Sequence, residues 1–440
     1  MSLNDKLAAA LASRDRRAIR RRLPDPAADD GLVDFSTNDY LALSRSPALR
    51  ARFLRQLAAA PDVLGSGGSR LLVNGRAHAA LEARLAAFFR APAALLFNSG
   101  FDANAGLFAC VPQPGDALLF DEHIHASVHD GVRASRVDPA ARVAFAHNSV
   151  PGLRKALGEL VAARPALRTG ASGVFVAVET LYSMDGTLAP LPEIVDAIDE
   201  LLPAGNGHLI VDEAHATGIY GPQGRGLVAA YGLEDRVFAR LHTFGKALAA
   251  TGAVLLVTPL VRDYLLNYAR PLIYTTALGH ANVVAAECSF DALEDGTAQQ
   301  LATRLLELSR YFLAALRSAL ATHRVPPALL SLPFHLALPS LALPPSSSSF
   351  SSSLALPSSA TPIVPVLTPH PRALAAHLRA RGLNARAITW PTVPKGADRV
   401  RVCLRADHSR ADVERLVRAM VEWAQSWPAV EVGAVVQAKL

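Results

Sequence analysis

The stretch His208-Leu209-Ile210-Val211-Asp212-Glu213-Ala214-His215 is short and apolar until it meets charge at Asp212. A strand of a parallel sheet that is buried on both faces has such an apolar run. The carboxyl ends of such strands border the crevice in which α/β proteins bind their ligands and substrates. The pattern therefore predicts a buried parallel strand with Asp212 and His215 at that crevice.

A lysine follows 34 positions after Asp212, in the stretch Thr243-Phe244-Gly245-Lys246. A pyridine ring that acts as an electron sink needs a carboxylate beside its nitrogen and an amine that forms a Schiff base with its aldehyde. Asp212 and Lys246 would supply these two groups, which indicates pyridoxal 5'-phosphate (PLP) as cofactor. Taken alone, such a Gly-Lys pair is more often a solvated surface charge than a Schiff base.

The run from Val211 to His215 also matches the Walker B strand of a helicase-type ATPase, where the acidic residue would hold magnesium. That interpretation requires a phosphate-binding loop of the form G-x-x-x-x-G-K-[ST]. Gly245-Lys246 is followed by Ala247, and Arg240 stands where the first glycine of the loop would be. An ATPase is therefore a minor alternative.

Composition narrows the class of protein. Of the 440 residues, 51% are hydrophobic and 19% are charged, which is typical of a globular protein with a large and a smaller domain. The three cysteines, Cys110, Cys288 and Cys403, form no C-x-x-C pair, so neither a disulfide framework nor a metal site is predicted. No apolar run has the length of a membrane span, so we expect a soluble protein.

The two ends of the chain carry possible signals. Six arginines lie between Arg14 and Arg22 and contribute to a net charge of +6, but without interleaved aromatic residues or a known motif they do not favour nucleic-acid binding. A mitochondrial presequence is disfavoured by Asp5 and Asp15. At the other end, Ala438-Lys439-Leu440 differs from the peroxisomal address Ser-Lys-Leu in one small residue, which predicts a peroxisomal location, with the cytoplasm as the alternative.

Helical and strand patterns alternate from about residue 81 to residue 257, which is typical of βαβ units around a mostly parallel sheet. A long helical segment, 281–321, then leads to a second region with fewer strands. The predicted organisation is an N-terminal segment (1–45), a large cofactor-binding domain (46–280), a small C-terminal domain (281–425) with a Ser- and Pro-rich insertion (333–362), and a tail (426–440). Strands are expected at 94–97, 117–120, 174–178, 208–211, 253–257, 363–367 and 400–404, and helices at 81–89, from 103 and at 410–423.

Other predicted strands also end in polar residues. Ser99, Gly100 and Phe101 follow one strand and precede a helix, so the amides of Gly100 and Phe101 would cradle a phosphate with the helix dipole behind them. His123 and His125 follow the next strand, so one of these two histidines would lie at the crevice, where a flat imidazole would stack on a pyridine ring. Ser183, after a further strand, would offer its hydroxyl to the ring oxygen. Taken singly, each motif is more often an ordinary turn or a surface histidine. Together they place polar groups from four strands at one edge of the sheet.

Nine sequence strings, in order between about residues 20 and 420, match the pattern of one family. These strings are Phe35 to Leu41, Gly65 to Arg70, Asn98 to Asn104, His125 to Ser127, Phe145 to Asn148, Ser183 to Gly186, Asp212 to Gly218, Thr243 to Lys246 and Pro391 to Pro394. The chain resembles the α-oxoamine synthases, which condense an amino acid with an acyl-CoA thioester and release carbon dioxide. The resemblance implies an α/β fold-type I PLP transferase, with a large mostly parallel-sheet domain and a smaller C-terminal α+β domain.

The resemblance also implies roles for matching residues. Lys246 would form the Schiff base and act as acid and base at Cα, and Asp212 would pair with the pyridinium nitrogen. The other implied roles are ring stacking by His125, hydrogen bonds to the ring oxygen from Ser183 and His215, phosphate binding by Thr243 and by the turn Ser99-Gly100-Phe101, carboxylate binding by Arg401, and positions near the substrate for Asn38 and Arg20.

In the family the site lies between two subunits, and Thr276 matches the residue that reaches the phosphate from the neighbour, so a homodimer is expected. The overall similarity is greatest to members that join L-alanine to pimeloyl-CoA in biotin synthesis. Glycine-using relatives, which make 2-amino-3-ketobutyrate or 5-aminolevulinate, share nearly every catalytic group and stay an alternative. A non-catalytic subunit would lack the lysine present here as Lys246. Before Pro391 the chain has Thr389-Trp390, whereas bacterial members usually have Arg-Pro, so a charge that would meet an acyl carboxylate is missing.

Overall fold

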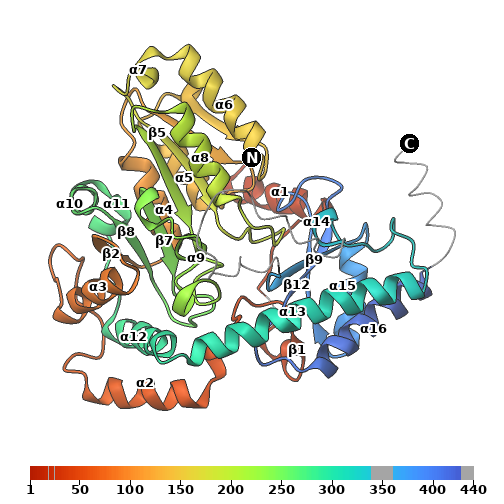
Figure 1. Ribbon diagram of the computed structural model, residues 1–440. Coiled ribbons are helices and arrows are strands. Elements are labelled where there is room, and N and C mark those ends of the chain that lie inside the picture. Colours follow the sequence, from red (N-terminus) through yellow and green to blue (C-terminus); the bar gives the residue numbers. More distant parts are fainter. Residues whose placement is uncertain (18, 24, 338–359, 428–440) are drawn as a thin grey trace.

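Two sheets organise the computed structural model, which describes residues 1–17, 19–23, 25–337 and 360–427. Figure 1 shows a larger body around β5, β7 and β8 and a smaller body around β9 and β12. The long helix α13 (Thr297–Thr322) runs from the larger body to the smaller one.

The larger sheet has seven strands in the order β2-β8-β7-β6-β5-β3-β4. Strand β8 is antiparallel to both of its neighbours, and the other adjacent pairs are parallel. The prediction of a mostly parallel sheet is thus confirmed. The strands are β2 (Ala93–Phe97), β3 (Ala117–Asp121), β4 (Arg142–Phe145), β5 (Val174–Glu179), β6 (Gly207–Asp212), β7 (Ala239–Thr243) and β8 (Ala253–Val257).

The central strands are apolar because both of their faces are covered. All six residues of β5 are buried, and the side chains of Val176 and Val211 have no exposed area. Burying an aliphatic side chain of this size contributes about 2 kcal/mol to stability. Two of the seven strands, β4 and β7, were absent from the sequence prediction. In β7 the apolar pattern is broken by Arg240 and His242, which are nevertheless buried.

Helices of the larger body pack on the sheet and on one another, α4 with α5 and α6 with α8. They are α2 (Pro47–Ala59), α3 (Arg76–Phe88), α4 (Gly100–Cys110), α5 (Ala126–Ala134), α6 (Val150–Ala163), α7 (Pro165–Arg168), α8 (Leu191–Leu201), α9 (Leu227–Ala230), α10 (Pro259–Tyr268), α11 (Arg270–Ile273) and α12 (His280–Glu294). Short 3-10 helices lie at Pro26–Asp29, Leu43–Arg45, Pro139–Ala141, Pro222–Gly224 and Glu234–Arg236.

The long helical segment predicted over 281–321 is two helices, α12 and α13. They are separated at Asp295 and Gly296, where Gly296 has a φ of +83°. A left-handed residue of this kind ends a helix, and glycine adopts it without steric cost. The side chain of Asp295 then accepts a hydrogen bond from the backbone N–H of Thr297, which begins α13.

The smaller body contains an antiparallel sheet in the order β11-β12-β9. A separate two-stranded parallel pair joins β1 (Val33–Asp34), near the N-terminus, to β10 (Leu383–Asn384). The other elements are β9 (Ile363–Leu367), β11 (Arg386–Ile388), β12 (Arg399–Cys403), α14 (Phe334–Ala337), α15 (Pro371–Ala380) and α16 (Arg410–Ser426). The N-terminal segment is thus tied to the C-terminal domain before it reaches the larger body.

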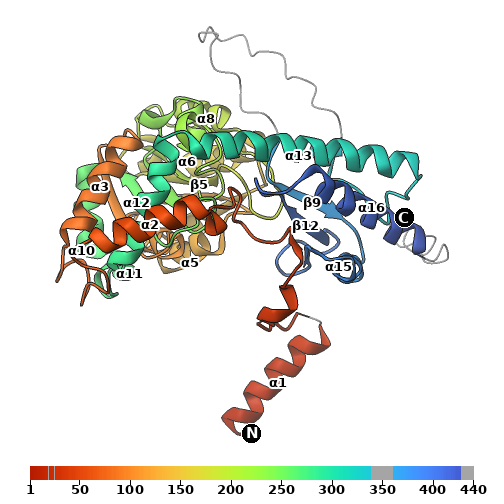
Figure 2. The same cartoon turned by 90° about the horizontal axis from the view of Figure 1, so that it is seen from below.

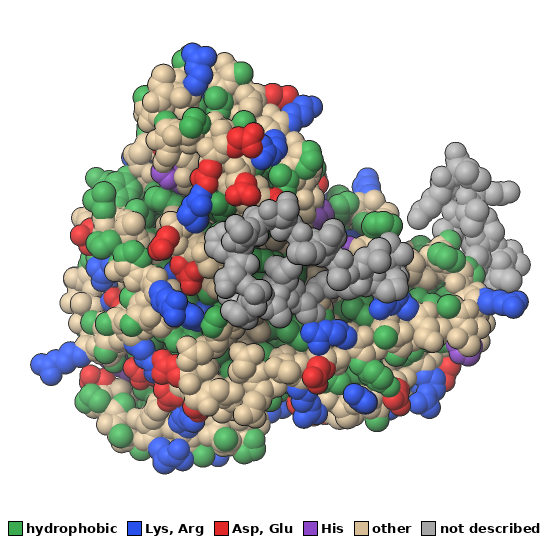
Figure 3. Space-filling model, in the orientation of Figure 1, with side chains coloured by type: hydrophobic (Ala, Val, Ile, Leu, Met, Phe, Trp, Pro, Cys, Tyr) green, Lys and Arg blue, Asp and Glu red, His purple; other side chains and the backbone are tan. Residues whose placement is uncertain are grey.

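Helix α1 (Leu3–Arg16) has no buried residue and projects away from the rest of the chain (Figure 2). Basic and acidic side chains are interspersed over the face of the molecule in Figure 3. Within the described ranges, no helix is long and apolar enough to span a bilayer. Most of the predicted insertion (338–359) and the end of the tail, including Ala438-Lys439-Leu440, lie outside the described residues.

Candidate active site

A cavity of about 470 Å³ opens at the carboxyl ends of the parallel strands of the larger sheet. Residues that follow β2, β3, β6 and β7, and the last residues of β5 and β6, contribute to its wall. Nine of the residues singled out from sequence line it together: Asn38, Ser99, Gly100, Phe101, His125, Asp212, His215, Thr243 and Lys246.

Lys246 lies in the turn three residues after β7 and lines this cavity. Burial lowers the pKa of Lys246 from its usual value, while the carboxyl groups of Asp212 and Glu179 act in the opposite direction. A lower pKa makes the uncharged, nucleophilic amine easier to form. The lysine is therefore suited to forming a Schiff base.

The carboxylate of Asp212, at the end of β6, is held by two donors. Its Oδ1 accepts the backbone N–H of Ala214 at 2.9 Å, and its Oδ2 accepts Nδ2 of Asn104 at 2.9 Å. Asn104 projects from α4 and is buried, with 1% of its surface exposed. Both contacts fix the orientation of this carboxyl group, which would be the partner of the pyridine nitrogen of PLP.

Asn104 also connects Asp212 with His125. Its Nδ2 donates to Oγ of Ser127 at 3.0 Å, and Oγ of Ser127 lies 2.8 Å from Nδ1 of His125. The backbone N–H of Ser127 donates to the same Nδ1, so that nitrogen is an acceptor and the hydroxyl of Ser127 is its second donor. The imidazole of His125 is thereby oriented at the start of α5, with its ring open to the cavity.

Glu179 is a lining residue to which the sequence analysis assigned no role. It is the last residue of β5 and pairs in register with Asp212 of β6. Burial, together with the charge of Asp212, raises the pKa of Glu179 well above its usual value. Its Oε1 is buried and has no hydrogen-bond partner among the described residues. Glu179 therefore adds to the site a buried carboxyl group whose neutral form is favoured by burial.

The part of the cavity wall that Ser99, Gly100, Phe101 and Thr243 form is suited to binding a phosphate group. Ser99 caps α4, whose first amides belong to Gly100 and Phe101, and a helix N-terminus favours an anion. Oγ1 of Thr243 is buried without a partner among the described residues. A Cβ on Gly100 would lie 2.4 Å from Cγ2 of Thr243, so only glycine leaves this space open. The orphaned hydroxyl and the open space together fit the phosphate of PLP.

His215 is buried beside the cavity, 6% exposed. Burial, with the nearby positive charges of Lys246 and Arg401, lowers the pKa of His215 well below its usual value. Arg401 itself does not line the cavity. Its Nη2 donates to Oδ1 of Asn38 at 2.9 Å, and its Nε donates to the carbonyl oxygen of Ser183 at 2.6 Å. Strand β12 of the small domain thus contacts the edge of the site.

Three other predicted residues lie outside the lining of this cavity. The contact described for Ser183 is through its backbone, and the role of its hydroxyl stays a prediction. Thr276 has an exposed side chain, and its carbonyl oxygen accepts a hydrogen bond from Asn98 at 2.7 Å. Arg20 lies in the exposed N-terminal segment and pairs with Asp15 at 2.6 Å.

Among the described residues, one His and Asp cluster has metal-ligand spacing: His123, His147 and Asp185. The two rings are stacked with centroids 4.3 Å apart, and both nitrogens of His147 already have protein partners. Arg399 of β12 lies 2.6 Å from Asp185 and would repel a cation. The cluster is an ion-pair contact between the two bodies of the protein.

The fold and the cavity together define a fold-type I PLP enzyme. The model of the family "Aminotransferase class I and II" matches residues 30–420. The 8-amino-7-oxononanoate synthase of Emericella nidulans is 45% identical over 426 residues, covering 96% of each chain. The aminoacyl transferase sphA of Aspergillus fumigatus is 36% identical over 91% of this chain and 83% of its own length. Serine palmitoyltransferase of S. paucimobilis, solved with PLP and myriocin bound, has the same fold, with a TM-score of 0.75, 23% identity, and coverage of 99% of this chain and 100% of that one.

The chain belongs to the aminotransferase class I and II family and, within it, to the PLP-dependent α-oxoamine synthases. The predicted family, fold class, cofactor and enzyme class are confirmed. Sequence reasoning missed Asn104 and Glu179 as parts of the site. Asn104 ends one of the strings that matched the family, and Glu179 directly follows the predicted strand 174–178, so each carried a signal that was not used.

Proposed function

We propose that this enzyme condenses L-alanine with pimeloyl-CoA to give 8-amino-7-oxononanoate, CoA and carbon dioxide, a reaction of biotin synthesis. The observation that carries the proposal is the 45% identity to the 8-amino-7-oxononanoate synthase of E. nidulans over 96% of both chains. A match that extends along nearly the whole length includes both domains, and with them the residues that shape a substrate pocket.

The residues of the cavity have distinct tasks in this proposal. When bound, PLP supplies an electron sink for the charge that develops at Cα of the amino acid. Lys246 holds the cofactor, yields it to the amine of L-alanine, and then moves the proton at Cα. Asp212 would keep the pyridine nitrogen protonated, His125 would stack on the ring, and His215 would donate to the ring oxygen.

Other residues bind and orient the cofactor and the amino-acid substrate. The amides of Gly100 and Phe101 and the hydroxyl of Thr243 would hold the phosphate and so anchor the cofactor in the cavity that Lys246 lines. Arg401, with Asn38 as its hydrogen-bond acceptor, binds the carboxylate of the amino acid. That carboxylate leaves as carbon dioxide after the new carbon–carbon bond has formed and CoA has departed.

A second candidate is the same reaction type with another substrate pair. It is favoured by the 36% identity to the aminoacyl transferase sphA over 91% of this chain. Glycine-using relatives belong to this alternative as well, since they share the catalytic groups. In all these cases the cofactor chemistry is unchanged and the acyl or amino-acid pocket differs.

Release of free CoA by the PLP-loaded protein separates these possibilities. L-alanine, glycine and L-serine would each be combined with pimeloyl-, succinyl-, acetyl- and palmitoyl-CoA, with Lys246→Ala as the inactive control. Selective turnover of L-alanine with pimeloyl-CoA supports the proposal. Selective turnover of any other pair would keep the reaction class and overturn the substrate assignment.

We also propose a homodimer with active sites shared between subunits. Three large apolar side chains are exposed in the single chain: Leu72 at 81%, Phe101, which lines the cavity, at 44%, and Tyr274, two residues before Thr276, at 72%. Exposed large apolar groups of this kind suit a protein interface. Sedimentation of the purified protein tests the proposal, since a concentration-independent monomer would contradict it.

The peroxisomal location stays a proposal based on Ala438-Lys439-Leu440. A fluorescent fusion that preserves the free C-terminus would test it against the same fusion lacking these three residues. Punctate fluorescence that depends on the tripeptide supports the peroxisome, and diffuse fluorescence in both supports the cytoplasm.

A further inference from the structure

Tyr40 and His215 meet beside the cavity, although 175 positions separate them in the sequence. The hydroxyl of Tyr40 lies 2.7 Å from Nδ1 of His215, and the tyrosine side chain has no exposed area. Because Tyr40 occupies the Nδ1 side of the imidazole, Nε2 is the nitrogen left for a ligand in the cavity that His215 lines. The proton on that nitrogen decides whether His215 donates or accepts there.

Two arrangements of protons are compatible with this contact. In one, the hydroxyl of Tyr40 donates to Nδ1 and the imidazole proton resides on Nε2. In the other, Nδ1–H donates to Tyr40, whose own proton goes to Oδ1 of Asn38 at 3.2 Å. Oδ1 of Asn38 already accepts Nη2 of Arg401 at 2.9 Å, and the contact to His215 is the shorter one for the tyrosine. The geometry therefore favours donation to His215.

We propose that Tyr40 is a positioning residue that sets the tautomer of His215, so that Nε2–H faces the cofactor site. In this tautomer His215 donates to an anionic oxygen, such as the ring oxygen of PLP, whereas the other tautomer would present a repelling lone pair. The charge states agree, because burial lowers the pKa of His215 and raises that of Tyr40 well beyond their usual values. The inference rests on the proposed role of His215 and is independent of the acyl-CoA used.

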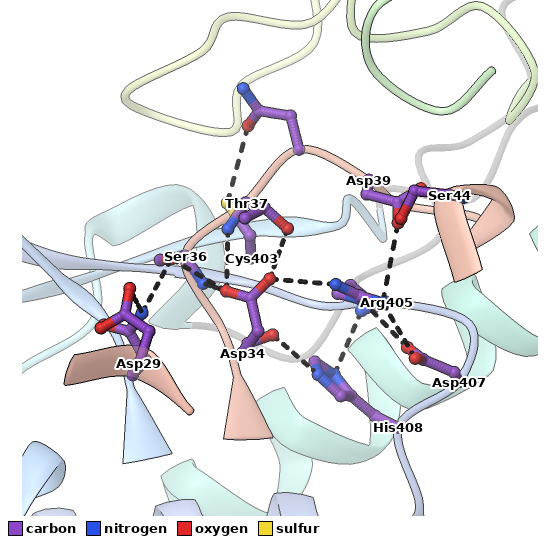
Figure 4. A network of polar contacts seen from close by, with 12 residues as sticks. Asp29, Asp34, Ser36, Thr37, Asp39, Ser44, Cys403, Arg405, Asp407 and His408 are labelled. Atoms are coloured by element: carbon purple, nitrogen blue, oxygen red, sulfur yellow. Dashed lines mark hydrogen bonds and ion pairs between the residues drawn. The ribbon is translucent and has the colours of Figure 1, made fainter. Parts of the chain in front are cut away.

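The N-terminal segment that carries Tyr40 is fastened to the small domain (Figure 4). Arg405 is 3% exposed, and its guanidinium lies 2.9 Å from Asp34 and 3.6 Å from Asp39. The carbonyl oxygen of Tyr40 accepts the backbone N–H of Ala406 at 2.8 Å. The small domain therefore holds the hydroxyl of Tyr40 in place against a residue of the large domain.

The tautomer can be measured directly by NMR on PLP-free protein labelled with 15N in the histidine rings. The His215 signals would be assigned by their loss in His215→Gln. We expect a protonated Nε2 and a hydrogen-bonded, unprotonated Nδ1 in the wild type, and a mixture of tautomers in Tyr40→Phe. A wild-type signal with the proton on Nδ1 would overturn the proposal without reference to any variant.

Two further variants serve as comparisons. Tyr220→Phe removes another buried hydroxyl, which donates to the carbonyl of Ala360, and should leave the His215 signals unchanged. Asn38→Ala removes the competing acceptor and should also leave the proton on Nε2. A shift of that proton to Nδ1 in Asn38→Ala would mean that Asn38, and not Tyr40, sets the tautomer.

The cofactor provides an independent readout. In Tyr40→Phe reconstituted with PLP, we expect the visible band of the form with an ionised ring oxygen to weaken in favour of the near-ultraviolet band. The dissociation constant of PLP should rise about threefold to tenfold, the effect of one weakened hydrogen bond. Unchanged spectra and affinity, with Tyr220→Phe as reference, would contradict the proposal, whichever acyl-CoA the enzyme uses.

Discussion

Glu179 and Asp212 stand opposite each other in register at the ends of β5 and β6, yet their hydrogen bonding differs. Asp212 accepts bonds from Asn104 and from the backbone of Ala214, whereas Oε1 of Glu179 has no partner among the described residues. Burial beside Asp212 raises the pKa of Glu179 well above its usual value. The two neighbouring carboxyl groups therefore differ in their hydrogen-bond partners, and burial favours the neutral form of Glu179.

This difference predicts a pH dependence of stability. In the unfolded state Glu179 loses its proton at about pH 4.3, the usual pKa of glutamate. In the folded state the raised pKa lets Glu179 keep this proton at higher pH. The stability that depends on the protonated carboxyl group of Glu179 is fully present below this pH. It is lost as the pH rises toward the raised pKa of the folded state. We expect the free energy of unfolding of the PLP-free protein to fall more steeply above about pH 5 in the wild type than in Glu179→Gln. Urea unfolding over a pH series measures this free energy. Glu193→Gln, at an exposed position on α8, is the control. The same pH dependence in the wild type and in Glu179→Gln would refute the raised pKa of Glu179.

The link between Asp212 and His125 predicts a role for Asn104 in cofactor binding. Asn104→Ala removes the donor to both Asp212 and Ser127. We expect the dissociation constant of PLP to rise about tenfold, since a hydrogen bond to a charged group contributes about 1.5 kcal/mol or more. Absorbance titration of the apoprotein with PLP measures this. Asn267→Ala, which deletes an exposed amide on α10, is the matched control, and equal affinities of the two variants would show that the link is unimportant.

The close approach of Gly100 to Thr243 predicts a rescue experiment. In Gly100→Ala the new Cβ would meet Cγ2 of Thr243 at 2.4 Å, so the phosphate end of the cavity must distort. We expect PLP affinity to fall about tenfold or more, in line with a cost above 1.4 kcal/mol. The double variant Gly100→Ala with Thr243→Ser lacks this methyl group but keeps the hydroxyl, and it should recover most of the affinity. Failure of the rescue would mean that the contact with Cγ2 of Thr243 is not the reason why a side chain at position 100 weakens PLP binding.

A Schiff base between PLP and Lys246 should give the protein a visible colour. Wild-type protein loaded with PLP should be yellow, and Lys246→Ala should lack the absorption of the Schiff base and any turnover. Treatment with borohydride, followed by peptide mapping, should place the label on Lys246. Lys155→Ala, an exposed position on α6, should behave as the wild type. A labelled peptide elsewhere in the chain would assign the cofactor to another lysine.

Much of the large domain could be predicted because its signals are local. Strand β5 is apolar up to Glu179, and the run Leu209-Ile210-Val211 of β6 is apolar up to Asp212, so burial on both faces is visible in the sequence. Strand β7 was not predicted because Arg240 and His242 interrupt its pattern. Each has a hydrogen-bond partner that is distant in the sequence, since Nη2 of Arg240 donates to the carbonyl oxygen of Phe89 and Nδ1 of His242 contacts Oγ1 of Thr217.

Short-range signals were thus enough to predict the α/β class and PLP as cofactor, because several strands end with a change from apolar to polar residues. The family was predicted by the resemblance of nine sequence strings to the α-oxoamine synthases. The tertiary structure decided which polar groups meet: Glu179 beside Asp212, Asn104 between Asp212 and Ser127, and Tyr40 against His215. The reason is physical. Periodicity reports which residues are buried, whereas hydrogen-bond partners and pKa values depend on side chains that only packing brings together.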